Sequence, residues 1–368
     1  MTHLSPAPSV DPFGQILFVG ISGTLLGPET RSLLARVRPG GIILFKRNVS
    51  SLADLASLCA SLKEGLDPPP LLAIDEEGGR VTRLAPHVTG LPAASLTTAI
   101  GDDRLREYWR RYGDLLASLG FDIDFAPVVD LCPPDAPNGI ADRSYGTDPE
   151  KVVACASAAI EGLLAAGVLP TLKHFPGLGD TLLDSHHHLP SVRKKRDAFE
   201  KEDLVPFLRL GNKAPAVMIG HGHYPFYAGP DPIAATLSKE ITTGLLRERA
   251  GFEGAAISDD LEMKAVAVRV AWEELAPRAV EAGNDMVLIC HSAERIAAAH
   301  EALRRRAGRD APFARRCEEA AGRVAALRTR LETVRGARRE PGGHAAPEAI
   351  ERARAALMET AALSVARA

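Results

Sequence analysis

Eight apolar, β-branched runs recur along the chain, and each is followed by a longer segment with helical spacing. The runs lack strict alternation of apolar and polar residues, which is typical of strands buried on both faces of a parallel sheet. They read QILFVGISG (15–23), GGIILFKRN (40–48), PLLAIDEEG (70–78), FDIDFAPVVDL (121–131), VLPTLKHFPG (168–177), APAVMIGHGHYP (214–225), FEGAAISDD (252–260) and NDMVLICHS (284–292). Helical spacing follows, for example, over residues 51–65, 148–167 and 237–251. This order predicts an α/β protein, either a (β/α)8 barrel or an open doubly wound sheet.

Charged and histidine residues stand at the ends of most of these runs, and they favour the barrel. They are Asp75, Asp130, Lys173, His174, His221, Asp259 and His291. In a (β/α)8 barrel the carboxyl ends of all strands converge on one mouth, where catalytic groups gather from distant parts of the sequence. The sequence therefore predicts a single TIM-type (β/α)8 barrel with a functional site at that mouth.

The C-terminal part of the chain departs from this alternation. Residues 294–335 are rich in Ala and Arg at helical spacing, which predicts helices packed on the exterior of the barrel. Residues 336–348 have the composition of a linker, and residues 349–368 the pattern of a final helix. We therefore expect a barrel domain over residues 1–335, and over 336–368 a linker and a C-terminal helical extension that packs on the barrel.

Composition and charge exclude several classes of protein. The chain has 368 residues, 46% of them hydrophobic, which suffices for a large core. A formal net charge of -3 without a long basic run in the first 300 residues predicts no nucleic-acid partner. No run of about 18 apolar residues and no secretory signal is visible, so we expect no membrane association and a cytoplasmic location. The five scattered cysteines lack CxxC spacing and indicate a reducing compartment.

Four histidines and two aspartates crowd into the stretch KHFPGLGDTLLDSHHHLP (173–190), which has no apolar period. Lys173 and His174 are expected at the end of the fifth strand, and the Gly and Pro residues after them force an irregular loop. A histidine such as His186 can give and take a proton near neutrality. Asp184, two residues before it, can hold the second ring nitrogen and fix the tautomer.

Neither a metal nor a nucleotide cofactor is expected. The histidines at 186–188 are adjacent, so in an extended loop they point to different sides, and no HxxxH or HExxH pair exists. A nicotinamide cofactor would require a GxGxxG motif after the first strand, whereas ILFVGISGTLLG (16–27) has a different glycine spacing.

The stretch GAAISDDLEM (254–263) carries a buried strand directly into Ser258, Asp259 and Asp260. Carboxylates at this position cost desolvation free energy unless something uses them. We interpret Asp259 as a nucleophile or base in the barrel mouth. The alternative is that an aspartate here only caps the next helix, a role that suits Asp260.

Two further stretches supply candidate binding groups. In IDEEGGRVTRL (74–84), Asp75 can accept hydrogen bonds from vicinal hydroxyls, and an arginine can hold an acid group bidentately. A surface turn with a salt bridge is the alternative, and it accounts for the two glutamates after Asp75. In NGIADRSYGTDPE (138–150), Arg143 and Tyr145 are candidates to line the mouth.

Taken as a set, these motifs resemble glycoside hydrolase family 3, and within it the bacterial β-N-acetylglucosaminidases of cell-wall recycling. The resemblance is carried by DEEGGRVTR, ADRSY, KHFPG-x-GDT-x-x-DSH, VMIGH and GFEGAAISDDLEM, and it runs from about Gly14 to His291. The DSH loop is the most specific of these, because it separates this branch from the β-glucosidases of the family.

The resemblance implies a retaining mechanism and assigns roles to particular residues. Asp259 matches the catalytic nucleophile, His186 an unusual general acid/base, and Asp184 its partner. The residues that match those holding the N-acetylglucosamine ring are Asp75, Arg83, Arg143, Lys173 and His174, with His221 as a weaker candidate. The implied partner is a small carbohydrate, a muropeptide or chitooligosaccharide that contains N-acetylglucosamine.

The chain departs from the family pattern at two positions and leaves two alternatives open. Leu178 stands where the family commonly has histidine, and Glu262 where a small residue usually follows SDDL. Phosphorolysis is one alternative, because a neutral histidine repels phosphate less than a carboxylate does. A non-catalytic sugar-binding barrel is the other, but a binding protein needs no nucleophile at Asp259.

Overall fold

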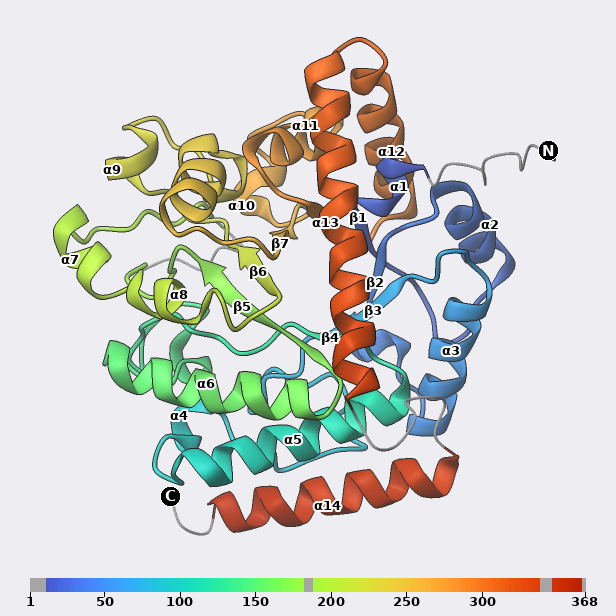
Figure 1. Cartoon of the computed structure of the whole chain (residues 1–368), viewed down its shortest axis with the longest axis vertical. Helices are drawn as coiled ribbons and strands as arrows, with labels where there is room; N and C mark the ends of the chain where they lie inside the picture. Colours follow the sequence, from blue (N-terminus) through green and yellow to red (C-terminus); the bar gives the residue numbers. More distant parts are fainter. Residues whose placement is uncertain (1–10, 182–187, 338–345, 366–368) are drawn as a thin grey trace, which may run out of the picture.

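The eight strands form a closed parallel barrel in chain order, which confirms the predicted (β/α)8 architecture (Figure 1). The computed structural model describes residues 11–181, 188–337 and 346–365. The strands are β1 (Leu17–Gly20), β2 (Gly41–Leu44), β3 (Leu71–Ile74), β4 (Ile123–Asp124), β5 (Leu169–Phe175), β6 (Ala216–Ile219), β7 (Ala255–Asp260) and β8 (Met286–Ile289). The barrel closes where β1 pairs with β8, with Leu17 opposite Val287.

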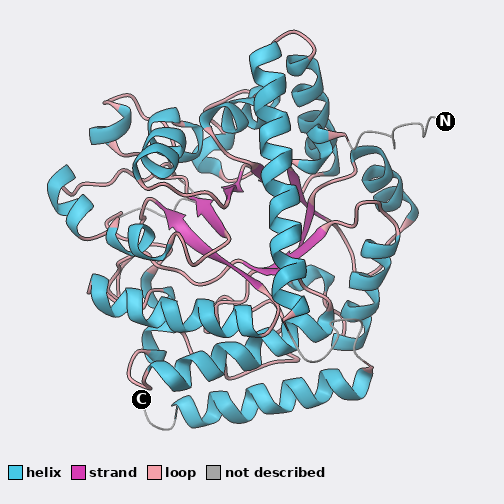
Figure 2. Cartoon of the chain, in the orientation of Figure 1, coloured by secondary structure: helices cyan, strands magenta, loops and turns pink. Residues whose placement is uncertain are grey.

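Helices connect the strands and surround the barrel (Figure 2). Helix α1 (Pro12–Gln15) precedes β1. The connections hold α2 (Pro28–Val37), η1 (Lys46–Asn48), α3 (Leu52–Glu64), α4 (Ala94–Thr97), α5 (Asp102–Leu119), η2 (Ala141–Arg143), α6 (Pro149–Ala165), α7 (Arg196–Lys201), α8 (Val205–Leu210), α9 (Pro225–Ala228), η3 (Ala235–Leu237), the π-helix η4 (Glu240–Arg249), α10 (Lys264–Ala267) and α11 (Trp272–Ala282). Helices α12 (Ala293–Ala307), α13 (Ala311–Gly336) and α14 (Pro347–Val365) follow β8.

Apolar side chains cover both faces of the strands, which explains why the runs in the sequence do not alternate. Phe18 and Phe125 point into the barrel, where their rings meet edge to face at 5.3 Å. Their neighbours Val19 and Ala126 belong instead to the larger cluster between the strands and the helices. A strand buried on both sides needs an apolar residue at nearly every position.

Helix α13 crosses the amino end of the barrel (Figure 1). The sequence had led us to expect that this segment packs on the side of the barrel. Its residues Val324, Leu327 and Leu331 join the apolar cluster of the barrel interior. On the same helix, Arg328 donates to the carbonyl of Gly40 and Arg335 to that of Phe121, both just before a strand begins. The barrel is thereby closed at one end and open only at the other.

Helix α14 lies along α5, and its side chains Ile350, Leu357 and Ala361 are buried in the outer apolar cluster (Figure 1). The division of the chain near residue 335 into a barrel domain and an extension stays a prediction. Across the described ranges 11–181, 188–337 and 346–365, no helix combines the length and apolar character needed to span a bilayer.

Candidate active site

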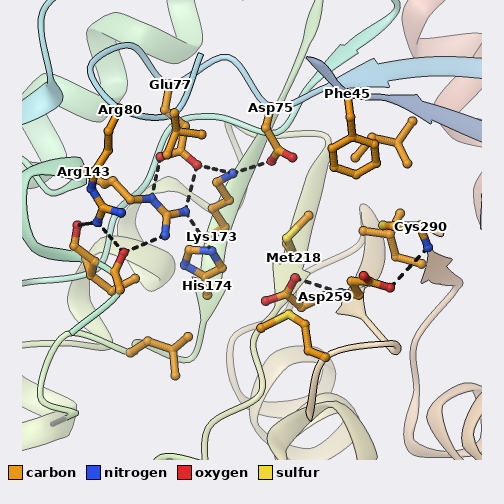
Figure 3. A pocket seen from close by; sticks show the side chains of 18 of the residues that line it. Phe45, Asp75, Glu77, Arg80, Arg143, Lys173, His174, Met218, Asp259 and Cys290 are labelled. Atoms are coloured by element: carbon orange, nitrogen blue, oxygen red, sulfur yellow. Dashed lines mark hydrogen bonds and ion pairs between the residues drawn. The ribbon is translucent and has the colours of Figure 1, made fainter. Parts of the chain in front are cut away.

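A cavity of about 360 Å³ lies at the carboxyl ends of the strands (Figure 3). Of the eight residues predicted as catalytic or substrate-binding, the six with described positions line it: Asp75, Arg83, Arg143, Lys173, His174 and Asp259. Asp184 and His186 lie outside the described residues. Thr181 and Pro190, which stand on either side of that segment in the sequence, both line the cavity.

Lys173 joins two carboxylates of the β3 end. Its ammonium lies 2.8 Å from Asp75 Oδ1 and 2.5 Å from Glu77 Oε1, and the residue is only 1% exposed. Burial alone would lower the pKa of Lys173, but the two carboxylates outweigh it and raise the pKa above its ordinary value. Lys173 is therefore a fixed cation at the floor of the cavity.

Glu77 connects the same lysine to Arg143. Arg143 Nε and Nη2 donate to the two oxygens of Glu77 at 2.7 and 2.8 Å, a bidentate pair. Burial would raise the pKa of Glu77, but Arg143 and Lys173 hold it far below its usual range. The sequence left a surface turn open as the alternative for this glutamate. The structure contradicts that alternative, because Glu77 is 5% exposed and lines the cavity.

Glu76 is also buried, and it shapes the loop that presents Arg83. Its Oε1 accepts the backbone N–H groups of Arg83 and Leu84 at 2.5 and 2.7 Å, and its Oε2 accepts the hydroxyl of Tyr112. Arg83 then donates to Asp75 Oδ2 at 3.2 Å. Burial raises the pKa of Glu76 to about 7. The chain can turn this tightly because Gly78 and Gly79 both adopt positive φ, at 83° and 56°.

His174 is held in one tautomer by two neighbours. Its Nδ1 lies 2.7 Å from Asp130 Oδ2, and its Nε2 lies 3.4 Å from Arg143 Nη2, which can only donate. The ring therefore carries its proton on Nδ1 and turns the lone pair of Nε2 toward Arg143. Asp130 also accepts the backbone N–H groups of His174 and Leu178, so it fixes the start of the following loop.

Asp259 stands apart from this network, across the cavity from Lys173 and His174 (Figure 3). Its Oδ1 accepts the backbone N–H of Asp260 at 2.8 Å. Within the described part of the chain, no cationic side chain forms an ion pair with it. Asp259 and its neighbour Asp260 are thus the two acidic residues of the described cavity wall that form no ion pair with a lysine or arginine.

Asp260 also reaches the cavity, beside His291. Burial, together with the charges of Glu262 and Asp259, raises the pKa of Asp260 to about 7. Its Oδ2 lies 3.5 Å from His291 Nε2. The His291 ring stacks on Phe45 at 5.8 Å, and these two rings form a cavity wall that the sequence did not indicate as a unit.

Two other candidates from the sequence are not on the cavity wall. His221 is fully buried, and its ring nitrogens contact Thr236 Oγ1 at 2.7 Å and the carbonyl of Asp260 at 2.9 Å. Tyr145 packs behind the mouth and accepts a hydrogen bond from Trp109 Nε1 at 3.2 Å. His221 follows β6 as predicted and Tyr145 lies in the connection after β4, but neither side chain lines the cavity.

Leu178, where a histidine is common in the resembling family, is buried in a small apolar cluster with Val128, Cys132 and Ile140. Its backbone N–H donates to Asp130 Oδ1 at 2.6 Å. The substitution therefore keeps the loop attached to the β4 end through the main chain. Among the residues with described positions, no group of three or more His, Cys, Asp or Glu is placed to hold a metal ion.

The fold and the cavity together define a (β/α)8-barrel enzyme with a polar site for a small ligand rich in hydrogen-bonding groups. Residues 13–326 match the model of the glycosyl hydrolase family 3 N-terminal domain. The chain belongs to glycosyl hydrolase family 3, as its motifs had indicated.

Known proteins of this family are similar along most of the chain. A β-hexosaminidase of Alkalilimnicola ehrlichii is 40% identical over 290 residues, which are 77% of this chain and 82% of that protein. A fungal multi-domain family 3 β-N-acetylglucosaminidase superposes with a TM-score of 0.84 at 30% identity, over 95% of this chain but only 42% of that one. The NagZ of Neisseria gonorrhoeae, solved with N-trifluoroacetyl-D-glucosamine, superposes with a TM-score of 0.77 at 29% identity, over 95% of this chain and 98% of that one.

Proposed function

We propose that the protein is a retaining β-N-acetylhexosaminidase that removes N-acetylglucosamine from the non-reducing end of small carbohydrates. The observation that carries the proposal is the position of Asp259, a carboxylate without a cationic partner among the described residues, opposite a buried network of charges. The names of the similar proteins, and the N-acylglucosamine bound to one of them, support the same substrate class.

In this proposal the network around Lys173 binds the sugar ring. Asp75 accepts hydrogen bonds from ring hydroxyls, since each carboxylate oxygen can accept more than one. Arg83, Arg143 and Lys173 donate to ring oxygens, and His174 adds an imidazole at the same wall. Because the cations are already paired with Asp75 and Glu77, they are oriented before the sugar arrives, and little free energy is lost in ordering them.

The chemistry divides between one carboxylate and one imidazole. An oxygen of Asp259 attacks the anomeric carbon, and the bond from that carbon to the leaving oxygen breaks while His186 gives this oxygen a proton. A water molecule then attacks the same carbon, His186 takes its proton, and the ester to Asp259 breaks. Two inversions give net retention. Asp184 holds the second ring nitrogen of His186 throughout.

Muropeptides of peptidoglycan recycling in the cytoplasm are the substrates that we propose, on the strength of the motif resemblance. A panel of N-acetylglucosamine-containing muropeptides and chitooligosaccharides, compared by kcat/KM, tests this choice. We expect the muropeptides to have the highest values. A clear preference for chitooligosaccharides would contradict the proposed source while leaving the reaction itself in place.

The reaction is tested with a chromogenic N-acetylglucosaminide and the variant Asp259→Ala. We expect a loss of about 10⁴-fold or more in kcat, because no nucleophile remains. The control is Glu150→Gln, which breaks an exposed pair with Arg209; neither residue lines the cavity, and kcat should stay within about twofold. A fluorosugar that traps the ester should label Asp259 in the wild type. A label elsewhere, or activity in Asp259→Ala, would overturn the assignment.

The role of His186 and the identity of the molecule that accepts the sugar, water or phosphate, are tested separately. His186→Ala should lose far more activity on a substrate with a poor leaving group than on one with a good leaving group, since only the former needs the proton. Product analysis with and without inorganic phosphate distinguishes hydrolysis from phosphorolysis. The proposal expects free N-acetylglucosamine in both cases, released first as the β-anomer. A sugar phosphate would establish phosphorolysis instead.

A further inference from the structure

The pairing between β7 and β8 changes register at Asp259. Ile257 lies opposite Met286 and Asp260 opposite Leu288, so three steps on β7 match two on β8. Strand β7 therefore holds one extra residue at Ser258–Asp259, a β-bulge. Bulges bend a strand and redirect a side chain, and they are frequent beside active sites. Here the bulge coincides with the point where the unpaired carboxylate enters the cavity.

A bulge removes backbone acceptors from the ladder, and side chains of β7 replace them. The buried N–H of Leu288 donates to Ser258 Oγ at 2.9 Å. The N–H of Cys290 donates to Asp260 Oδ1 at 3.3 Å, and that of His291 to Glu262 Oε2 at 2.5 Å. These alternate residues of the β7 end, Ser258, Asp260 and Glu262, form what we call the side-chain ladder.

The first rung stands directly before the carboxylate, and it is fully buried. Ser258 has no exposed surface, so water cannot replace its hydroxyl as the acceptor for Leu288. On the other side of Asp259, the N–H of Leu261 donates to the carbonyl of Leu288 at 2.9 Å. The same residue of β8 thus ties β7 down both before and after Asp259.

We propose that Ser258 is a positioning residue for Asp259, whose carboxylate it aims by holding the bulge against β8. The inference rests on the proposed role of Asp259 as the nucleophile. In this proposal, Ser258 does not contact the substrate. Its effect is on the direction of attack, because a nucleophile displaced by even 1 Å can lose about a hundredfold in rate.

The test compares Ser258→Ala with Ser258→Thr, which keeps a hydroxyl. The matched control is Thr242→Val, which removes another fully buried hydroxyl, one that donates to the carbonyl of Ala235 away from the cavity. We expect Ser258→Ala to lower kcat about 30- to 100-fold, with KM and the Kd for N-acetylglucosamine within about twofold. Ser258→Thr should recover kcat to within about fivefold, and Thr242→Val should leave both constants unchanged.

Pre-steady-state labelling with the trapping fluorosugar separates this inference from the proposed function. If the wild type carries the label elsewhere than Asp259, the proposed function fails. If Asp259 is labelled and Ser258→Ala forms the ester at the wild-type rate, only the positioning role fails. If Ser258→Ala does not fold, the test uses Ser258→Cys, whose thiol is a weaker hydrogen-bond acceptor than the hydroxyl. A reduced kcat at unchanged KM supports the role, and a wild-type kcat overturns it.

Discussion

Glu77 and Arg143, which lie 66 residues apart in the sequence, form a bidentate ion pair at the rim of the cavity. Their side chains are 4% and 11% exposed, so solvent screens the pair only weakly. Removing one partner of such a pair leaves the other charge without compensation, which typically costs about 3 to 5 kcal/mol.

We therefore expect Glu77→Gln to damage both stability and activity. The amide keeps the shape of the carboxylate, but Arg143 and the buried Lys173 lose a negative neighbour. The free energy of unfolding should fall by about 3 kcal/mol, and kcat/KM by about a hundredfold, as the sugar-binding cations reorient. The control Glu150→Gln breaks an exposed pair with Arg209 and should cost under about 1 kcal/mol. Equal effects of the two substitutions would contradict the role of Glu77.

Asp260 should make stability depend on pH. Its pKa is raised from 3.8 to about 7, so between these values the folded state binds one proton more than the unfolded state. The stabilisation is complete below about pH 4 and is lost as the pH rises through about 7. A difference of about three pKa units at about 1.4 kcal/mol each gives a span of the order of 4 kcal/mol.

Asp260→Asn removes this contribution, because the amide does not titrate in this range. The unfolding free energy of the variant minus that of the wild type should therefore be a few kcal/mol larger at pH 8 than at pH 4.5. Chemical denaturation at the two pH values measures the change. Glu76, a buried carboxyl whose pKa is also raised to about 7, is present in both proteins, so its contribution drops out of the comparison. A difference between variant and wild type that does not vary with pH would contradict the raised pKa.

The barrel and the strand-end positions follow from the sequence because they depend on local patterns. A run buried on both faces and a polar residue directly after it are visible without knowing any partner, and Asp75, Lys173 and Asp259 were found in this way. The burial of Glu76 and Glu77 was missed, since it is made possible by Tyr112 and Arg143, which are distant in the sequence. Spacing alone cannot show which far residue will neutralise a carboxylate.

The position of α13 was unpredictable for a similar reason. Its arginines look like a solvated helix face in the sequence, yet Arg316 and Arg323 reach under the barrel to Asp285, at 2.8 and 3.2 Å. Only the closed barrel brings that aspartate, which precedes β8, within their reach. Ser258 shows the same limit on a smaller scale, because a bulge depends on the register between two strands and not on either one alone.

Asp285 leads to a prediction that separates stability from activity. This fully buried carboxylate accepts hydrogen bonds from Arg247, Arg316 and Arg323 at the closed end of the barrel. Asp285→Asn leaves three arginines without their common counter-charge, and the unfolding free energy should fall by about 3 to 5 kcal/mol. Since the amino end of a barrel supports stability and the carboxyl end supports catalysis, kcat and KM of the folded variant should stay within about twofold. A large change in kcat with little loss of stability would contradict this separation.

Glu262, which stands where the resembling family usually has a small residue, joins the β7 end to the start of α12. Its carboxylate accepts the backbone N–H groups of His291 and Ser292 and lies 3.5 Å from Arg295 Nη1. These N–H groups belong to the amino end of a helix, where a negative charge is stabilising. Glu262→Ser should therefore lower the unfolding free energy by about 1 to 2 kcal/mol, and Glu262→Gln, which keeps an acceptor but not the charge, by about half as much.

The kinetic effect of Glu262→Ser should appear in binding more than in chemistry. His291 stacks on Phe45 in the cavity wall, and Glu262 holds the main chain of His291 in place, so a freed His291 loosens that wall. We expect KM to rise severalfold while kcat changes less than in Ser258→Ala, because Ser258 directly precedes Asp259 whereas Glu262 is the rung farthest from it. The control is Glu294→Ser, an exposed acid in the first turn of α12, which should leave stability and both kinetic constants nearly unchanged. If Glu262→Ser lowered kcat as much as Ser258→Ala at constant KM, the rungs would act as one unit, and the special role of the serine would be wrong.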